Sequence, residues 1–165
     1  MRILILTCNT GAGHNSCAAA IQEACARRGD VCVIEDALRL VSPGFSKLLS
    51  SGHVWIYRHT PDLFRVGYTF TEKHREVFQR DSMAYRVLSS GVKTLRGLVE
   101  KGHYDVVLSV HVLSSLVLTE LLKRYHPNII TGFVATDYTC SPGGKYGDLD
   151  CCFIPDACIA PGLHV

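Results

Sequence analysis

The chain has little charge, no long apolar run and no leader-like N-terminus. Charged residues make up 19% of its 165 residues and the formal net charge is +2, so charge gives no reason to expect a nucleic-acid partner. No apolar stretch approaches the roughly 18 residues that cross a bilayer. Met1 leads almost at once into a strand-like run, which leaves no room for a signal peptide. We therefore expect a cytoplasmic protein without a membrane-spanning helix.

The eight cysteines never show the Cys-x-x-Cys spacing of a typical zinc ligand pair. Four lie in or beside predicted strands and helices, where a free thiol behaves as a small apolar side chain: Cys8, Cys17, Cys25 and Cys32. The others are closer together, at Cys140, Cys151, Cys152 and Cys158. Without a secretory signal we expect no disulfide framework. Without the ligand spacing we predict no metal site, although one among the last four stays open.

Short apolar runs alternate with segments of helical spacing, which is typical of parallel strands joined by helical crossovers. Hydrophobic residues make up 47% of the chain, enough for one domain with a substantial core. The pattern predicts an α/β fold, a Rossmann-like parallel sheet with helices on both faces. The first helix is expected to bury Cys17, Ile21 and Ala24. The predicted strands are 2–7, 31–35, 106–110, 129–135 and 152–154, and the predicted helices 15–28 and 113–125.

Residues 41–98 interrupt this rhythm and form a predicted helical insertion after the second strand. Aromatic and apolar side chains are interleaved there with cations, a pattern that can dock at an anionic membrane interface. The candidate membrane contacts are Phe45, Trp55, Tyr57 and Arg58. The alternative is an ordinary amphipathic insertion packed on the sheet, and composition alone favours that alternative.

Polar residues follow three of the predicted strands. The first strand ends in the turn 8–15 (CNTGAGHN), whose histidine stands where the next helix begins. Carboxyl ends of parallel strands meet at one edge of the sheet, so His14, His111 and Asp137 are expected to share a crevice. The partial positive charge of a helix N-terminus favours a neutral His14 imidazole, which can take a proton from a substrate hydroxyl. Asp137 would orient that histidine or hold the hydroxyl. Each of the three also has a structural alternative, as a cap, a turn residue or a satisfied polar group.

The glycines of the turn allow two interpretations. Gly11 and Gly13 would let a substrate approach the backbone closely. Together with Asp36, which follows the second strand, they also loosely copy the dinucleotide-binding fingerprint, although its third glycine position holds Ser16. A stand-alone nucleotide- or dinucleotide-binding module is therefore the alternative function.

Three segments share one resemblance: residues 11–20 (GAGHNSCAAA), 104–111 (YDVVLSVH) and 134–138 (VATDY). They resemble, in order, motifs of the monogalactosyldiacylglycerol synthase and processive diacylglycerol glucosyltransferase family. These are GT-B enzymes related more distantly to the MurG glycosyltransferase. Two positions depart from the family pattern: Val112 stands where proline is frequent, and no histidine follows Asp137 in the next residues.

The resemblance implies that residues 1–165 are the N-terminal, acceptor-binding half of a GT-B glycosyltransferase that transfers a hexose to diacylglycerol or a similar lipid. His14 matches the family's candidate general base. The implied acceptor-binding residues are Gly11, Gly13, Asn15, His111 and Thr136. The donor, expected to be a UDP-hexose, would be bound by a C-terminal domain that we expect this chain to lack, and we expect no cofactor on the present domain. The insertion would then contact an anionic surface, the inner face of the cell membrane.

Overall fold

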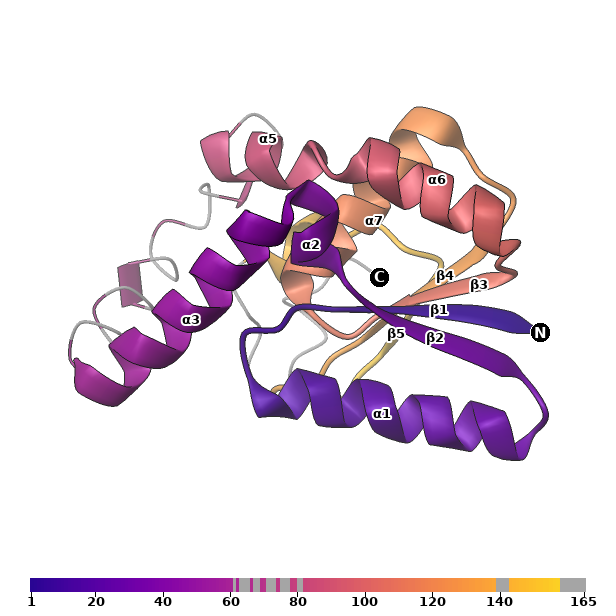
Figure 1. The fold of residues 1–165 in the computed structure, drawn as a ribbon, viewed down its shortest axis with the longest axis horizontal. Helices are drawn as coiled ribbons and strands as arrows, with labels where there is room; N and C mark the ends of the chain where they lie inside the picture. The colour runs from indigo at the N-terminus through magenta and orange to yellow at the C-terminus, as the bar shows by residue number, and fades with distance from the viewer. Residues whose placement is uncertain are drawn as a thin grey trace.

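A computed structural model describes residues 1–60, 62, 66, 69–70, 74, 78–79, 82–138 and 143–157. Five parallel strands form one sheet in the order β2-β1-β3-β4-β5 (Figure 1). They are β1 (Arg2–Thr7), β2 (Val31–Asp36), β3 (Val106–Ser109), β4 (Ile130–Val134) and β5 (Cys151–Phe153). Every predicted strand is present, and each end lies within one residue of its prediction. The α/β Rossmann-like fold is therefore confirmed.

Helices cover both faces of the sheet (Figure 1). They are α1 (Ala12–Arg27) on one face, and α2 (Ala37–Val41), α5 (Met83–Ser89), α6 (Val92–Gly102) and α7 (Val112–Tyr125) on the other. The central strand β1 contributes to both cores: Leu4 and Leu6 belong to the core under α5–α7, and Ile3 and Ile5 to the core under α1. A parallel strand buried on both sides needs a continuous apolar run, which is what β1 has.

Helix α1 begins three residues earlier than predicted, at Ala12 and not at residue 15. Glycines are poor helix formers, which is why the sequence suggested a loop up to His14. In the structure Gly11 is the N-cap and Gly13 already lies in the first turn, together with His14. The buried face also differs from the prediction, because Ala18 is fully buried whereas Ala24 is exposed.

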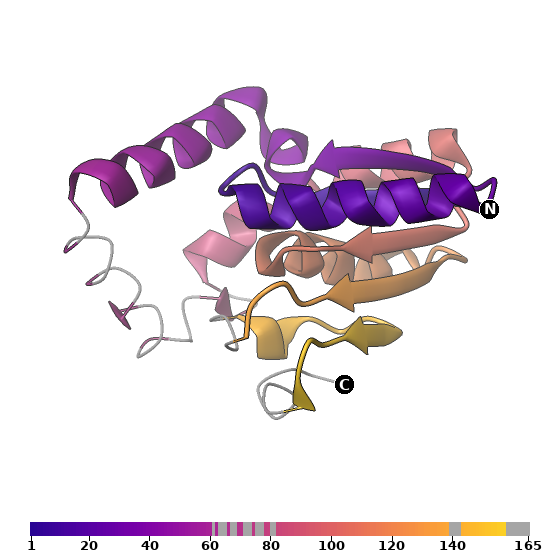
Figure 2. The ribbon, with the colours of Figure 1, turned by 90° about the horizontal axis from the view of Figure 1, so that it is seen from below.

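Asp36 ends β2 and begins the insertion. Its side chain accepts a hydrogen bond of 3.0 Å from the backbone N–H of Leu38 and thereby caps α2. Ser46 donates its hydroxyl to the other carboxylate oxygen. Ser46 lies in α3 (Pro43–His59), whose N-cap is Ser42 and whose first residue is proline, both typical of a helix start. From this anchored end, α3 extends away from the sheet (Figure 2).

The described parts of residues 41–98 are largely helical, as predicted. The last part belongs to the sheet's own crossover, because α6 continues to Gly102 and packs against α7. Within the described residues, no helix combines the length and apolarity needed to cross a membrane. The predicted loop 136–150 contains a 3₁₀ turn, Gly144–Tyr146, and its residues 139–142 lie outside the described part of the chain.

Candidate functional site

The strand order creates a switch point between β1 and β3. The chain leaves β1 toward β2 on one side, whereas β3, β4 and β5 lie on the other side. In open parallel sheets, ligands bind beyond the carboxyl ends of the strands at such a point. The structure brings three predicted site residues together there, His14 after β1, His111 after β3 and Thr136 after β4.

Two oxygens from distant segments hold Nδ1 of His14. One is the backbone oxygen of Val110, the residue after β3, at 2.8 Å, and the other is Oγ1 of Thr136, two residues beyond β4, also at 2.8 Å. A carbonyl oxygen can only accept a hydrogen bond, so Nδ1 carries the proton and donates it. Thr136 Oγ1 is then a second acceptor for the same N–H. These contacts fix both the tautomer and the orientation of the His14 ring.

This tautomer leaves Nε2 of His14 with its lone pair, because a neutral imidazole carries only one N–H. Among the residues that the structure describes, none forms a hydrogen bond with Nε2. The side chain is half-buried, and a Cβ added at Gly11 or Gly13 would meet nothing within 4 Å. In a neutral ring, Nε2 of His14 keeps its lone pair and has no hydrogen-bond partner among the described residues, which is what a general base needs.

His111 is the N-cap of α7. Its Nδ1 accepts a hydrogen bond of 3.0 Å from the backbone N–H of Leu113, so its own proton is on Nε2. That nitrogen lies 3.3 Å from Oγ1 of Thr10. The rings of His111 and His14 meet edge-on, with centroids 4.4 Å apart and planes at 65°. The sequence left open whether His111 is a satisfied structural residue or lines the pocket, and the structure shows a cap bond with the ring beside the candidate base.

Asp137 is exposed, and the residue at Nδ1 of His14 is its neighbour Thr136. The sequence suggested that the carboxylate would orient the histidine, because an aspartate is the usual partner of a catalytic histidine. In the structure, the hydroxyl of Thr136 contacts Nδ1 of His14. The sequence had suggested Thr136 as an acceptor-binding residue. The other suggested role of Asp137, holding the acceptor hydroxyl, stays a prediction.

Asn15 stabilises the turn that carries His14. Its Oδ1 accepts a hydrogen bond of 3.0 Å from the Thr7 hydroxyl, and its Nδ2 donates to Oδ1 of Asn9 at 3.2 Å. Both ends of this amide are therefore engaged within the turn. The predicted contact of Asn15 with an acceptor stays a prediction, since the amide keeps a second N–H and a second lone pair.

A pair of buried serines below the crevice was not predicted. The hydroxyl oxygens of Ser109 and Ser114 lie 2.9 and 2.8 Å from the backbone oxygen of His111 and 2.7 Å from each other, so one hydroxyl donates to that oxygen and the other to its partner serine. They fix the backbone from which the His111 ring projects. Burial also raises the pKa of the nearby Cys8 thiol well above its usual value, so Cys8 is a neutral core group and not a nucleophile. The one signal for this serine pair in the sequence was Ser109, a polar residue at the end of the apolar strand β3.

The carboxylate of Asp36 is already engaged in the fold. In dinucleotide-binding domains, an acidic residue after the second strand accepts hydrogen bonds from ribose hydroxyls. Here the two oxygens accept hydrogen bonds from Leu38 and Ser46. The geometry therefore disfavours the dinucleotide-binding alternative.

The four candidate membrane contacts do not share one environment. Phe45 is partly buried and packs against the domain core, so it does not belong to the outer surface of α3. Trp55 is 57% exposed. Leu48, which was not among the predicted membrane contacts, is 73% exposed. These two are seven positions apart and so lie on one side of the helix. The side chains of Tyr57 and Arg58 lie outside the described residues, although both belong to α3.

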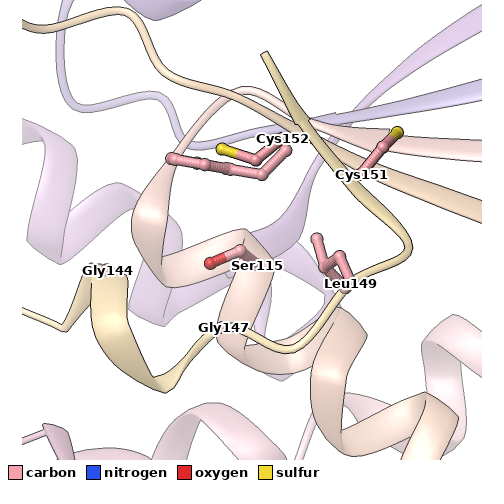
Figure 3. A pocket seen from close by; sticks show the side chains of 7 residues that line it. Ser115, Gly144, Gly147, Leu149, Cys151 and Cys152 are labelled. Atoms are coloured by element: carbon pink, nitrogen blue, oxygen red, sulfur yellow. The ribbon is translucent and has the colours of Figure 1, made fainter. Parts of the chain in front are cut away.

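A small hollow, whose lining contains neither His14 nor His111, lies between α7 and the β4–β5 edge (Figure 3). It is lined by Ser115, Phe133, Gly144, Gly147, Leu149, Cys151 and Cys152. Its volume of about 10 Å³ suits one water molecule. The hydroxyl of Ser115 already donates to the backbone oxygen of Val112, at 2.8 Å. The hollow is therefore too small for a sugar or a lipid.

The open question of a metal site concerns the later cysteines. Cys151 and Cys152 are adjacent on β5 and therefore point to opposite faces of the sheet. Cys140 and Cys158 lie outside the described residues. Over the described ranges, no three histidine, cysteine, aspartate or glutamate side chains are grouped as metal ligands would be.

The parallel sheet with helices on both faces, and the histidines at its switch point, are those of a Rossmann-like domain. The family model described as Monogalactosyldiacylglycerol (MGDG) synthase matches residues 14–160. The match covers most of the chain and begins at His14, and the chain belongs to this family. The resemblance inferred from the three motifs is thereby confirmed. No match is found among curated proteins or among solved structures.

Proposed function

We propose that this chain is the acceptor-binding part of a membrane-associated glycosyltransferase that transfers a hexose from a nucleotide sugar to diacylglycerol or a similar lipid. Membership of the monogalactosyldiacylglycerol synthase family supports both glycosyl transfer and a diacylglycerol acceptor. The donor we propose is a UDP-hexose, bound mainly by a separate C-terminal domain. The place of action we propose is the inner face of the cell membrane.

In this proposal His14 is the general base. The acceptor hydroxyl donates its proton to Nε2, and the acceptor oxygen attacks the anomeric carbon of the sugar. The bond from that carbon to the diphosphate breaks, and the nucleoside diphosphate leaves with the electron pair. Attack opposite the leaving group inverts the anomeric centre. A positioned base contributes about 10²–10⁴-fold to the rate of such a step.

The exposed side of α3 is the proposed membrane contact. Trp55 and Leu48 leave apolar surface on a helix that extends from the domain (Figure 2). An amphipathic helix with such side chains can lie in the interface between headgroups and acyl chains. Contact there would bring the carboxyl edge of the sheet to the acceptor, which itself resides in the bilayer.

The observation that carries the proposal is the open Nε2 of His14 in a chain of this family. The test is His14→Ala in an enzyme that joins this chain to its donor-binding domain, assayed with UDP-hexose and diacylglycerol in vesicles. We expect kcat to fall by about 10²–10⁴-fold. A fall of only a few-fold would reject His14 as the base.

The matched control is His126→Asn. His126 is exposed and lies just before β4, at the amino edge of the sheet and far from the crevice. Its φ of 45° is in the left-handed region, which asparagine tolerates better than most residues. We expect this variant to keep the parent rate, because it removes a histidine without touching the site.

A further inference from the structure

We propose that Thr136 is a positioning residue for His14. Its hydroxyl oxygen and the carbonyl oxygen of Val110 together take the place at Nδ1 that a carboxylate takes in a Ser-His-Asp triad. The catalytic part of this inference rests on the proposed function, whereas the tautomer of His14 does not.

The two oxygens that contact Nδ1 of His14 belong to residues that follow two different strands, β3 and β4. Val110 follows β3, where its backbone N–H donates to the oxygen of Leu6 at 3.0 Å. The residue before Thr136 is fixed in the same way, because Ala135 N donates to the oxygen of Phe153 at 2.9 Å. The backbone at or next to both hydrogen-bond acceptors is therefore held by the hydrogen bonds of the sheet. One acceptor would leave the His14 ring free to tilt, and two acceptors define its plane.

The two oxygens matter most when His14 becomes charged. Taking the acceptor proton turns the ring into an imidazolium, and a hydrogen bond from a charged donor is roughly twice as strong as a neutral one. The bonds at Nδ1 therefore strengthen as the reaction proceeds, which lowers the barrier more than it improves substrate binding. The other titratable ring facing His14 is His111, whose Nδ1 is occupied as an acceptor from Leu113.

Two substitutions separate the hydroxyl from the shape of Thr136. Thr136→Val keeps the branched side chain and removes the oxygen, and Thr136→Ser keeps the oxygen. In the two-domain enzyme we expect Thr136→Val to lower kcat about tenfold, the value of one hydrogen bond to a charged group. We expect its KM to stay within about twofold, and Thr136→Ser to restore kcat to within about threefold of the parent, because the acceptor is present again.

A second measurement uses the present chain alone and needs no activity. Nitrogen-15 resonances of the histidine rings report which nitrogen carries the proton. We expect His14 to show the Nδ1–H tautomer, and we expect its Nδ1 resonance to move in Thr136→Val but not in Thr136→Ser. An Nε2–H tautomer in the parent chain would overturn the inference. So would a Thr136→Val variant with unchanged kcat and unchanged His14 resonances.

The experiments also separate this inference from the proposed function. If Asp137→Asn lowers kcat about tenfold and Thr136→Val does not, the orienting role belongs to the carboxylate and the inference is wrong. If His14→Ala leaves transfer unchanged, the proposed function fails, and the nitrogen-15 data still decide whether Thr136 sets the ring.

Discussion

The crevice at the carboxyl edge of the sheet and the helix α3 differ in how their side chains are held. In the crevice, Nδ1 of His14 is held by two segments distant from it in the sequence, and Nδ1 of His111 is held by the start of its own helix. On α3, Trp55 and Leu48 are mostly exposed, and the helix is fixed near its first turn, where Ser46 meets Asp36. In the proposed function, proton transfer requires fixed geometry and contact with a bilayer requires exposed apolar surface, and the two would lie in different regions of the chain.

The largest effect is expected where the two regions join. Asp36→Ala removes the cap of α2 and the bond to Ser46, each worth about 1 kcal/mol, so the free energy of unfolding should fall by about 2 kcal/mol. In a domain of this size the melting temperature should fall by about 4–8 °C. Urea unfolding followed by circular dichroism measures the change.

The control for the Asp36 substitution is Asp148→Ala. Asp148 pairs with Lys123 at 3.3 Å on the surface, and exposed pairs contribute about 0–1 kcal/mol. If Asp36→Ala and Asp148→Ala unfolded at the same urea concentration as the parent, Asp36 would not hold α3 to the sheet.

A smaller effect is expected from the exposed side of α3. Leu48→Ser combined with Trp55→Ser should weaken binding to vesicles of mixed neutral and anionic phospholipid by about tenfold or more, because each apolar side chain can contribute up to roughly 1.5–3 kcal/mol when fully buried. Co-sedimentation measures the affinity, and the urea midpoint should not change. The matched control is Ile130→Ser, since Ile130 is 61% exposed at the opposite edge of the sheet. Equal binding by both variants would remove α3 from the membrane contact.

The smallest effect is expected from a nicotinamide dinucleotide. Both oxygens of Asp36 are occupied by the fold, so addition of NAD to the chain should leave its melting temperature unchanged. A saturable rise with NAD concentration would indicate binding to the folded state. That result would support the dinucleotide-binding alternative.

Much of the sheet could be predicted from the sequence, because its strands are short apolar runs separated by clear turn signals. The helix starts were harder. Gly11 and Gly13 suggested a loop, yet packing of Ala18 against the sheet carries α1 through them. Ser42, followed by proline, was a usable signal for the start of α3, because serine is a preferred N-cap and proline fits the first helical position.

The candidate site was only partly predictable for a different reason. That His14, His111 and Thr136 approach one another follows from parallel strand order, which the alternating pattern implies. The sequence does not say whether Thr136 or Asp137 contacts His14. The two residues are adjacent, and their side chains point in different directions from the backbone. Likewise, nothing in the apolar character of Phe45 and Trp55 indicates that one packs on the core and the other does not. Whether a given residue contacts His14, or packs on the core, depends on the direction of its side chain, which cannot be read from a single sequence.

The contacts at Nδ1 of His14 connect residues that are 96 and 122 positions apart in the chain. Contacts of such long range form late, because most of the chain must be ordered before they can close. On a ribosome, the histidine is made long before either of its partners. The orientation of the His14 ring is therefore set late in folding, after β1, β3 and β4 have paired. A partly folded chain has the histidine without the two oxygens that orient its ring.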